Sequence, residues 1–156
     1  MKNFKHKRIV LVCGSSKGIG LAIGKKFLES GDNVIFSSRT ILKKKDKIKI
    51  FLKKYQNQIF IKKLDFSKIE AVKNLKLKFI NEFKKIDILV TSAGMSSGNI
   101  KLPMKSQELQ KSIDQNLKTC VLPAEIFLKD LIKSKGSIVA ISSIAGIEYL
   151  SAPISY

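Results

Sequence analysis

The sequence predicts an α/β fold in which helices cover both faces of a doubly wound parallel sheet. Short runs rich in β-branched residues alternate with longer stretches of helical periodicity, in the order β-α-β-α-β-α-β-α-β. A glycine-rich turn follows the first run, which is the position typical of a nucleotide-binding loop. With 156 residues, of which 44% are hydrophobic, the chain can form the core of one domain.

The strands are predicted from apolar runs that suit burial on both faces of a sheet. The first is the uninterrupted run Ile9–Cys13. Four further strands are expected at residues 33–37, 58–64, 86–91 and 137–142. Because each pair of strands is separated by a helical stretch, we expect a parallel sheet with helices on both faces.

The helices are predicted from apolar residues spaced three and four positions apart. They are expected at residues 18–30, where Gly31 ends the helix, and at 40–55, 68–84 and 106–134. Pro123 is expected to kink the last of these. The buried stripe of that helix is expected to contain Ile113, Leu117, Val121, Ala124, Leu128 and Leu131.

The composition excludes several classes of protein. No apolar run approaches the roughly 18 residues that span a bilayer, so a membrane protein is not expected. Two cysteines, Cys13 and Cys120, do not make a disulfide framework, which favours the reducing cytoplasm. The net charge is +18, but nearly all the cations are lysines spread along the chain, which favours a solvated surface over a nucleic-acid partner.

The motif that carries chemistry is the turn Cys13-Gly14-Ser15-Ser16-Lys17-Gly18-Ile19-Gly20. Between a strand and a helix, such a turn brings backbone N–H groups and the helix N-terminus against a pyrophosphate. Gly14 would allow the tight turn, Gly18 would remove a Cβ from the path of the phosphates, and Gly20 would let the helix pack closely on the strand. The spacing therefore predicts dinucleotide binding.

This turn resembles that of the classical short-chain dehydrogenase/reductase family, which reads T-G-x-x-x-G-I-G. Further landmarks of the family follow in order along the whole chain. They are Asp65-Phe66 after the third strand, the segment DILVTSAG at 87–94, Asn116-Leu117 in the long helix, Ser143 beyond the fifth strand, and Tyr156 thirteen residues after it.

The resemblance implies a Rossmann-like fold, with five strands present in the order 3-2-1-4-5. It also implies hydride transfer between NAD(P)(H) and a small-molecule carbonyl or alcohol. It implies that Tyr156 is the general acid and base, that Ser143 binds the substrate oxygen, and that Asn116 supports a water-linked proton relay. It also implies a homo-oligomer for the full-length form, and no metal site. The cofactor-binding residues that we expect are Gly14, Ser16, Lys17, Gly18, Ile19, Gly20, Arg39, Asp65, Phe66, Ala93 and Gly94.

The cofactor expected is NADP rather than NAD. An acidic residue after the second strand would bind the ribose 2′-OH of NAD and repel a 2′-phosphate. The chain reads Ser37-Ser38-Arg39-Thr40 at this point and has no carboxylate there. Arg39 offers a fork that suits phosphate, and Lys17 adds a second cation from the glycine turn.

Three departures from the family pattern stand out. Cys13 replaces the usual threonine, and Thr91 and Ser92 replace an asparagine pair, which we expect to soften the centre of the sheet. The sequence also stops at Tyr156, whereas the catalytic lysine of the family would follow four residues later. We therefore expect residues 1–156 to be an NAD(P)-binding domain that is truncated at its C-terminus.

Two alternatives remain open from the sequence. One is a catalytically inactive dinucleotide-binding remnant, and the other is a basic protein that binds nucleic acid or anions on the same fold. Nicotinamide turnover would identify the enzyme, and salt-sensitive DNA binding would identify the nucleic-acid protein. The sequence does not reveal the identity of the substrate.

Overall fold

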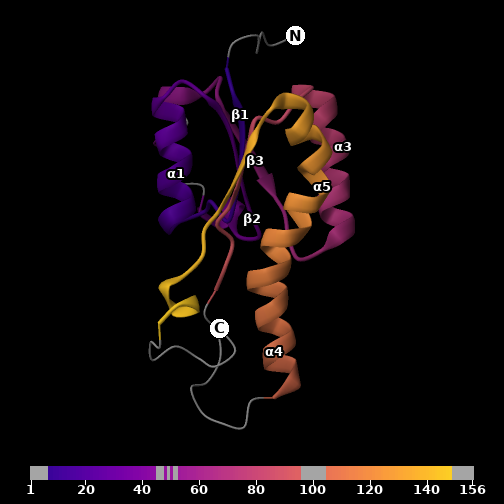
Figure 1. Cartoon of the computed structure of the whole chain (residues 1–156). Helices are drawn as coiled ribbons and strands as arrows, with labels where there is room; N and C mark the ends of the chain where they lie inside the picture. Colours follow the sequence, from indigo (N-terminus) through magenta and orange to yellow (C-terminus); the bar gives the residue numbers. More distant parts are fainter. Residues whose placement is uncertain (1–6, 45–47, 49, 51–52, 96–104, 149–156) are drawn as a thin grey trace.

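The sheet contains five parallel strands in the order β3-β2-β1-β4-β5, which confirms the predicted fold class (Figure 1). The computed structural model describes residues 7–44, 48, 50, 53–95 and 105–148. Its strands are β1 (Ile9–Cys13), β2 (Asn33–Ser38), β3 (Ile59–Lys63), β4 (Ile88–Thr91) and β5 (Ser137–Ala140). Every strand lies within two residues of its predicted limits, because each was predicted from a local apolar run.

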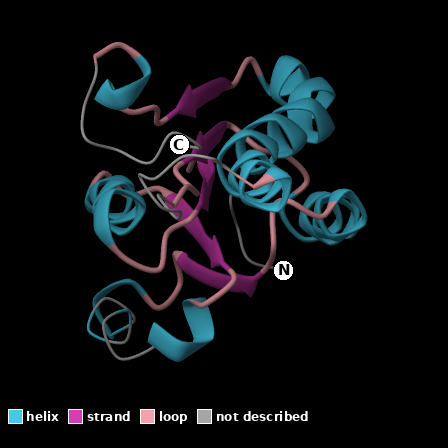
Figure 2. Ribbon diagram, turned by 90° about the horizontal axis from the view of Figure 1, so that it is seen from below, coloured by secondary structure: helices cyan, strands magenta, loops and turns pink. Residues whose placement is uncertain are grey.

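Helices cover both faces of the sheet, as Figure 2 shows from the end where the strands finish. The helix α1 (Gly18–Glu29) covers one face, and α3 (Ile69–Phe83) and α5 (Lys118–Ser134) cover the other. Successive residues of β1 therefore enter two separate cores. Val10 packs on the α1 side, whereas Leu11 packs with the residues of α3 and α5, and both are fully buried.

The stretch predicted as one long helix is divided by a change of helical type. It consists of α4 (Ser106–Ser112), a π-helical turn η2 (Ile113–Leu117) and α5. The helix continues through Pro123, which is buried, so the irregularity lies at the π-helical turn rather than at the proline. The first backbone N–H after this turn, that of Lys118, donates to the Ile113 carbonyl oxygen five residues back.

Three of the six residues predicted for the buried stripe of this helix are exposed. Leu117, Val121 and Leu128 are exposed, and the buried residues of α5 are Thr119, Pro123, Phe127 and Leu131. A π-helical turn contains one residue more than an α-helical turn, so the periodicity read from Ile113 and Leu117 no longer applies after it. Ala124 and Leu131 do contact the core, as predicted.

The lysine-rich helix predicted at 40–55 is described only in part. A short 3-10 helix, η1 (Ile41–Lys44), follows β2, and residues 48, 50 and 53–55 are helical. Ile41 and Ile48 are fully buried on the α1 side of the sheet. The rest of that prediction lies outside the described residues. A second 3-10 helix, η3 (Ile144–Gly146), follows β5.

No helix within the described ranges is both long enough and apolar enough to cross a bilayer.

Candidate functional site

The glycine-rich turn between β1 and α1 is folded tightly against the end of β4. Gly14 has a φ of +81°, and a Cβ at this position would lie 2.6 Å from the backbone nitrogen of Ala93. The Gly14 N–H donates to the Ser37 carbonyl oxygen at 2.8 Å, which ties the turn to β2. Glycine is therefore required here both by its backbone conformation and by the space available.

Ser15 braces the same turn, a role that the sequence analysis missed. Its buried hydroxyl donates to the Val12 carbonyl oxygen at 2.8 Å and accepts from the Ser37 N–H at 2.7 Å. The turn is thus joined by side-chain hydrogen bonds to both β1 and β2. A serine directly after the first glycine of such a turn is the only sequence signal that pointed to it.

The other two glycines of the motif have different surroundings. Gly18 has a φ of +56°, and no atom of the described residues lies within 4 Å of where its Cβ would be. A Cβ on Gly20 would lie 2.7 Å from the Gly14 carbonyl oxygen, so this glycine allows close contact with the turn rather than with the strand. The close approach of helix to strand is made by Gly24, whose added Cβ would collide with the Phe36 ring.

The N-terminus of α1 has no intramolecular anion among the described residues. Lys17 occupies the N-cap position without a capping hydrogen bond from its side chain, and the first turn contains no acidic residue. The backbone N–H groups at this end therefore keep their capacity to donate to a ligand. Together with the helix dipole, they favour an anion beside the open space at Gly18.

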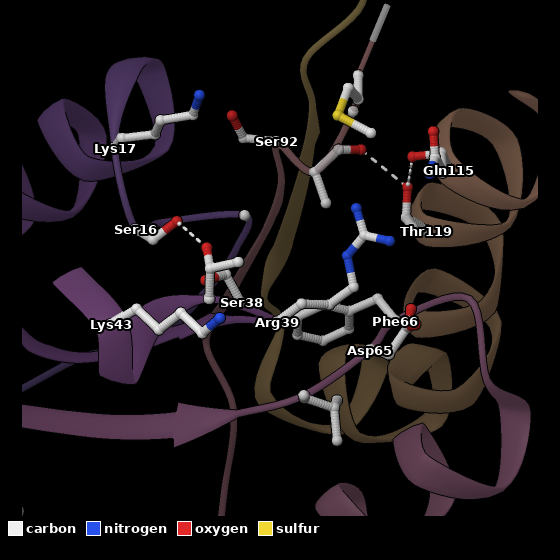
Figure 3. Close-up of a pocket in the computed structure, with 16 residues that line it drawn as sticks. Ser16, Lys17, Ser38, Arg39, Lys43, Asp65, Phe66, Ser92, Gln115 and Thr119 are labelled. Carbon is white, nitrogen blue, oxygen red and sulfur yellow. Dashed lines mark hydrogen bonds between the residues drawn. The ribbon is translucent and has the colours of Figure 1, made fainter. Parts of the chain in front are cut away.

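A cavity of about 400 Å³ lies at the carboxyl ends of β1 to β4, next to this turn (Figure 3). Eight of the predicted cofactor-binding residues line it: Gly14, Ser16, Lys17, Arg39, Asp65, Phe66, Ala93 and Gly94. Gly18, Ile19, Gly20, Asn116 and Ser143 are described but are not part of its lining. The structure adds eight residues that the sequence analysis did not predict to bind the cofactor, namely Ser38, Thr40, Lys43, Leu64, Ser92, Met95, Gln115 and Thr119.

The charge of the cavity lining is predominantly positive. Lys17, Arg39 and Lys43 contribute three cations, and Asp65 is the one acidic residue among the described residues of the lining. One carboxylate oxygen of Asp65 accepts from the backbone N–H of Ser67 at 3.0 Å and from its hydroxyl at 2.7 Å. That oxygen is therefore already engaged in the turn that leads to α3.

Two predicted cofactor-binding residues, Phe66 and Ile19, differ widely in exposure. Phe66 is only 2% exposed, and its ring packs in the core on the α3 and α5 side. It therefore offers a ligand mainly its backbone. Ile19 lies at the start of α1 and is 61% exposed.

Asn116 lies in the π-helical turn and holds the loop that follows β4. Its Oδ1 accepts from the Met95 N–H at 2.8 Å, and its Nδ2 donates to the Met95 carbonyl oxygen and to the Ser112 hydroxyl, each at 3.2 Å. One turn later, the Thr119 hydroxyl lies 2.8 Å from the Ala93 carbonyl oxygen. Residues 93–95 are thus attached to the α4–α5 region at two points.

Two of the three predicted catalytic residues, Asn116 and Ser143, lie in the part of the chain that the structure describes. Ser143 precedes η3, where its hydroxyl oxygen accepts from the Ala145 N–H at 3.2 Å. Tyr156 lies outside the described residues. Asn116 contacts a residue of the cavity lining, because its side chain is hydrogen bonded to Met95.

The residues that depart from the family pattern lie side by side at the neighbouring carboxyl ends of β1 and β4. Cys13 and Thr91 are register partners, and the Ser92 N–H donates to the Cys13 carbonyl oxygen at 3.1 Å. The Thr91 hydroxyl lies 3.2 Å from the Cys120 sulfur. Burial raises the pKa of the Cys13 thiol well above its ordinary value. The softening that we expect at the centre of the sheet stays a prediction.

Comparisons with known proteins agree with one another. The family described as short chain dehydrogenase matches residues 8–156. A 3-oxoacyl-(acyl-carrier-protein) reductase FabG of Rickettsia typhi is 34% identical over 138 residues, which cover 88% of this chain and 54% of that protein. A dehydrogenase/reductase SDR family protein 7-like of Dictyostelium discoideum is 34% identical over 157 residues, which cover 92% of this chain and 47% of that protein. The chain spans about half the length of the curated relatives it matches.

Solved structures have the same fold. An alcohol dehydrogenase from the archaeon Thermococcus sibiricus, complexed with 5-hydroxy-NADP, has a TM-score of 0.87 at 22% identity, over 97% of this chain and 64% of its own. A structure described as ElxO with NADP bound has a TM-score of 0.86 at 31% identity, over 96% of this chain and 60% of its own.

Proposed function

Since the chain belongs to the short-chain dehydrogenase family, we propose that it is the nucleotide-binding part of an oxidoreductase that uses NADP(H). The reaction proposed is hydride transfer between the cofactor and a carbonyl or alcohol substrate. Residues 1–156 would form one NAD(P)-binding domain of a cytoplasmic enzyme that assembles as a homo-oligomer.

The observation that carries the proposal is the cationic cavity at the carboxyl ends of the strands. The open space at Gly18 and the uncapped N-terminus of α1 suit a pyrophosphate. The end of β2 carries Arg39 and no carboxylate, which suits a ribose 2′-phosphate and not a free 2′-hydroxyl. These residues therefore fit NADP better than NAD.

The residues of the chain would share the chemistry as follows. When bound, the nicotinamide supplies or accepts the hydride. We assign Ser143 to hydrogen bonding of the substrate oxygen and Tyr156 to proton transfer at that oxygen. A phenol has a pKa of about 10, so Tyr156 needs a nearby cation to act at neutral pH.

Asn116 would act mainly as a positioning residue in this scheme. Its side-chain amide is engaged with both backbone groups of Met95, so it fixes the loop that forms one wall of the cavity. With these hydrogen bonds made, its side chain is engaged in holding the loop and not in the water-linked relay that the family resemblance implies.

The first substrate to test is a 3-oxoacyl thioester. Curated relatives at 30–34% identity are named 3-oxoacyl-(acyl-carrier-protein) reductase, and that name is the source of this choice. Turnover by the full-length protein should be followed as NADPH oxidation and should disappear in Tyr156→Phe. Turnover that survives Tyr156→Phe would contradict the assignment of Tyr156.

Cofactor preference is tested by titrating NADPH and NADH separately, with binding followed by fluorescence. We expect NADPH to bind at least tenfold more tightly, and Arg39→Asp to remove that preference because an acid repels the 2′-phosphate. Lys133→Asp, at an exposed position in the last turn of α5, is the matched control for the charge change. Equal affinities for NADPH and NADH in the unaltered protein would contradict the proposal.

A further inference from the structure

We propose that Lys68 and Lys111 steer the anionic cofactor into the cavity from a polar groove beside it. The groove has a volume of about 340 Å³ and is lined by residues of α4, η2 and the turn that leads into α3. The inference rests on the proposed function, because it takes NADPH as the ligand that is steered. It assigns a kinetic role to two residues that do not line the cofactor cavity.

The groove and the cofactor cavity adjoin each other. Arg39, Asp65 and Gln115 line both of them. Figure 3 shows Asp65 and Gln115 on the side of the cavity opposite Lys17, so the groove adjoins the cavity on that side. A ligand that reaches the groove is therefore already at the edge of the cavity.

The groove carries positive charge that its own residues do not neutralise. Its charged residues are three cations and two acids, namely Arg39, Lys68, Lys111, Asp65 and Asp114. Lys68 and Lys111 are exposed, and neither forms an ion pair with a carboxylate of the described residues. One oxygen of Asp65 is engaged by the N–H and the hydroxyl of Ser67.

The second acid of the groove is also engaged by other groups. Oδ1 of Asp114 lies 2.7 Å from the Lys118 Nζ and accepts from the Gln110 side chain at 2.9 Å. These two hydrogen bonds lower the pKa of Asp114, and the charge of Lys68 has the smallest of the effects on it. The acids therefore leave the two lysines of the groove free to attract an anion from solution.

Lys68 occupies a position where a lysine does not favour the helix. It is the N-cap residue of α3, and its side chain makes no capping hydrogen bond. N-cap positions favour Ser, Thr, Asp and Asn, and the positive end of the helix dipole repels a cation. Lys17 has the same position before α1, on the other side of the cavity. Both lysines therefore raise the positive potential around the cavity without stabilising the helices that they precede.

Such a positive rim attracts NADPH before any contact is made. The 2′-phosphate and the pyrophosphate give NADPH several negative charges. Cations that flank a cavity raise the local concentration of an anion and its association rate, and this effect weakens as salt is added. Because Lys68 and Lys111 do not line the cavity, we expect them to act on the arrival of the cofactor and not on its retention.

Stopped-flow measurement of NADPH binding to the full-length protein tests this role. The double variant Lys68→Ser/Lys111→Ala is compared with Lys78→Ala/Lys129→Ala, which removes the same charge from exposed positions of α3 and α5 that line neither the groove nor the cavity. At 20 mM sodium chloride we expect the first variant to lower the association rate constant about fivefold and to change the dissociation rate constant less than twofold. The control should lower the association rate constant less than twofold. The difference between the two variants should vanish at 0.5 M sodium chloride, where the charges are screened.

Lys68→Ser alone separates this role from a structural one. Serine is a better N-cap residue than lysine, so the melting temperature should rise by about 2–4 °C while association slows. A lysine that served only to stabilise α3 would give the opposite result, a lower melting temperature with an unchanged association rate.

The outcomes separate this inference from the proposed function. If NADPH binds but the Lys68/Lys111 variant changes only the dissociation rate, or slows association no more than the control does, the inference is overturned and the proposed function stands. If the unaltered protein does not bind NADPH, both are overturned. A slower association that is specific to Lys68 and Lys111 and disappears at high salt establishes the two lysines as steering residues.

Discussion

Two glycines with left-handed backbone differ in how much space surrounds them. Gly14 has a φ of +81° and would place a Cβ 2.6 Å from the backbone of Ala93, whereas Gly31 has a φ of +88° and open space around its Cβ position. Replacing either with alanine costs about 1–2 kcal/mol for the backbone conformation alone. Gly14 carries an additional collision with backbone atoms that cannot rotate away.

We therefore expect Gly14→Ala to lower the free energy of unfolding by more than about 3 kcal/mol, and Gly31→Ala by about 1 kcal/mol. Urea denaturation followed by circular dichroism measures both. Gly31→Ala is the matched control, because it has the same type of backbone strain without the collision. Equal losses in the two variants would show that the close contact between the glycine turn and β4 is not important for stability.

Cys13 should be unreactive in the folded protein. Burial raises the pKa of its thiol, so the thiolate that attacks electrophiles is scarcer at pH 8 than it would be for an exposed cysteine, and the reagent has no access. We expect iodoacetamide to modify Cys13 at least a hundredfold more slowly in buffer than in 6 M guanidinium chloride. Mass spectrometry of peptides measures the two rates, and fast labelling of Cys13 in buffer would contradict the burial of β1.

In α5, two adjacent residues test the corrected orientation of the helix. Phe127 is fully buried and its ring centroid lies 5.6 Å from that of Phe79, whereas Leu128 is 46% exposed. We expect Phe127→Ala to lower the free energy of unfolding by about 3–5 kcal/mol and Leu128→Ala by less than about 1 kcal/mol. Denaturant titration of both variants measures this difference. The reverse order would restore the orientation that periodicity predicted.

The error in that orientation has a definite physical cause. Periodicity assumes one rotation per residue along the whole helix, but the π-helical turn Ile113–Leu117 contains one residue more per turn. The residues after the turn are therefore rotated relative to those before it. The same turn places Asn116 where its amide meets the backbone of Met95, so the irregularity also shapes the cavity wall.

For the molecule as a whole, the net charge of +18 predicts a dependence of stability on salt. The chain has 30 lysine and arginine residues but only 12 aspartate and glutamate residues. Repulsion between the positive side chains therefore destabilises the folded state when salt does not screen it. The Debye length falls from about 30 Å at 0.01 M to about 8 Å at 0.15 M ionic strength. We expect the melting temperature to rise by several degrees between 10 and 150 mM sodium chloride, as measured by calorimetry.

Choline chloride at the same ionic strength serves as the control for this experiment. A similar rise in both salts would show that screening is the cause, whereas a rise in one salt alone would indicate specific ion binding. A melting temperature that stays constant or falls in both salts would contradict the prediction.

The whole fold also explains why the cavity contains residues from distant parts of the chain. Strands of a parallel sheet all end at the same edge, so Gly14, Arg39, Asp65 and Ala93 meet there although they lie far apart in the sequence. This convergence could be predicted, because the β-α alternation makes the strands parallel and so brings their carboxyl ends to one edge. The sequence analysis therefore anticipated half of the residues that line the cavity.

The sequence by itself determined the strands, their order, the glycine turn and the family, because these depend on local apolar runs and on short motifs. Only the tertiary structure decided which side of α5 is buried, that Gly24 meets Phe36, and that Ser38 and Lys43 reach the cavity. Each of these depends on where a second segment lies in space. A π-helical turn, a collision between helix and strand, and a cavity formed where several segments meet leave no periodic signal in the chain, because they arise only when the segments pack together.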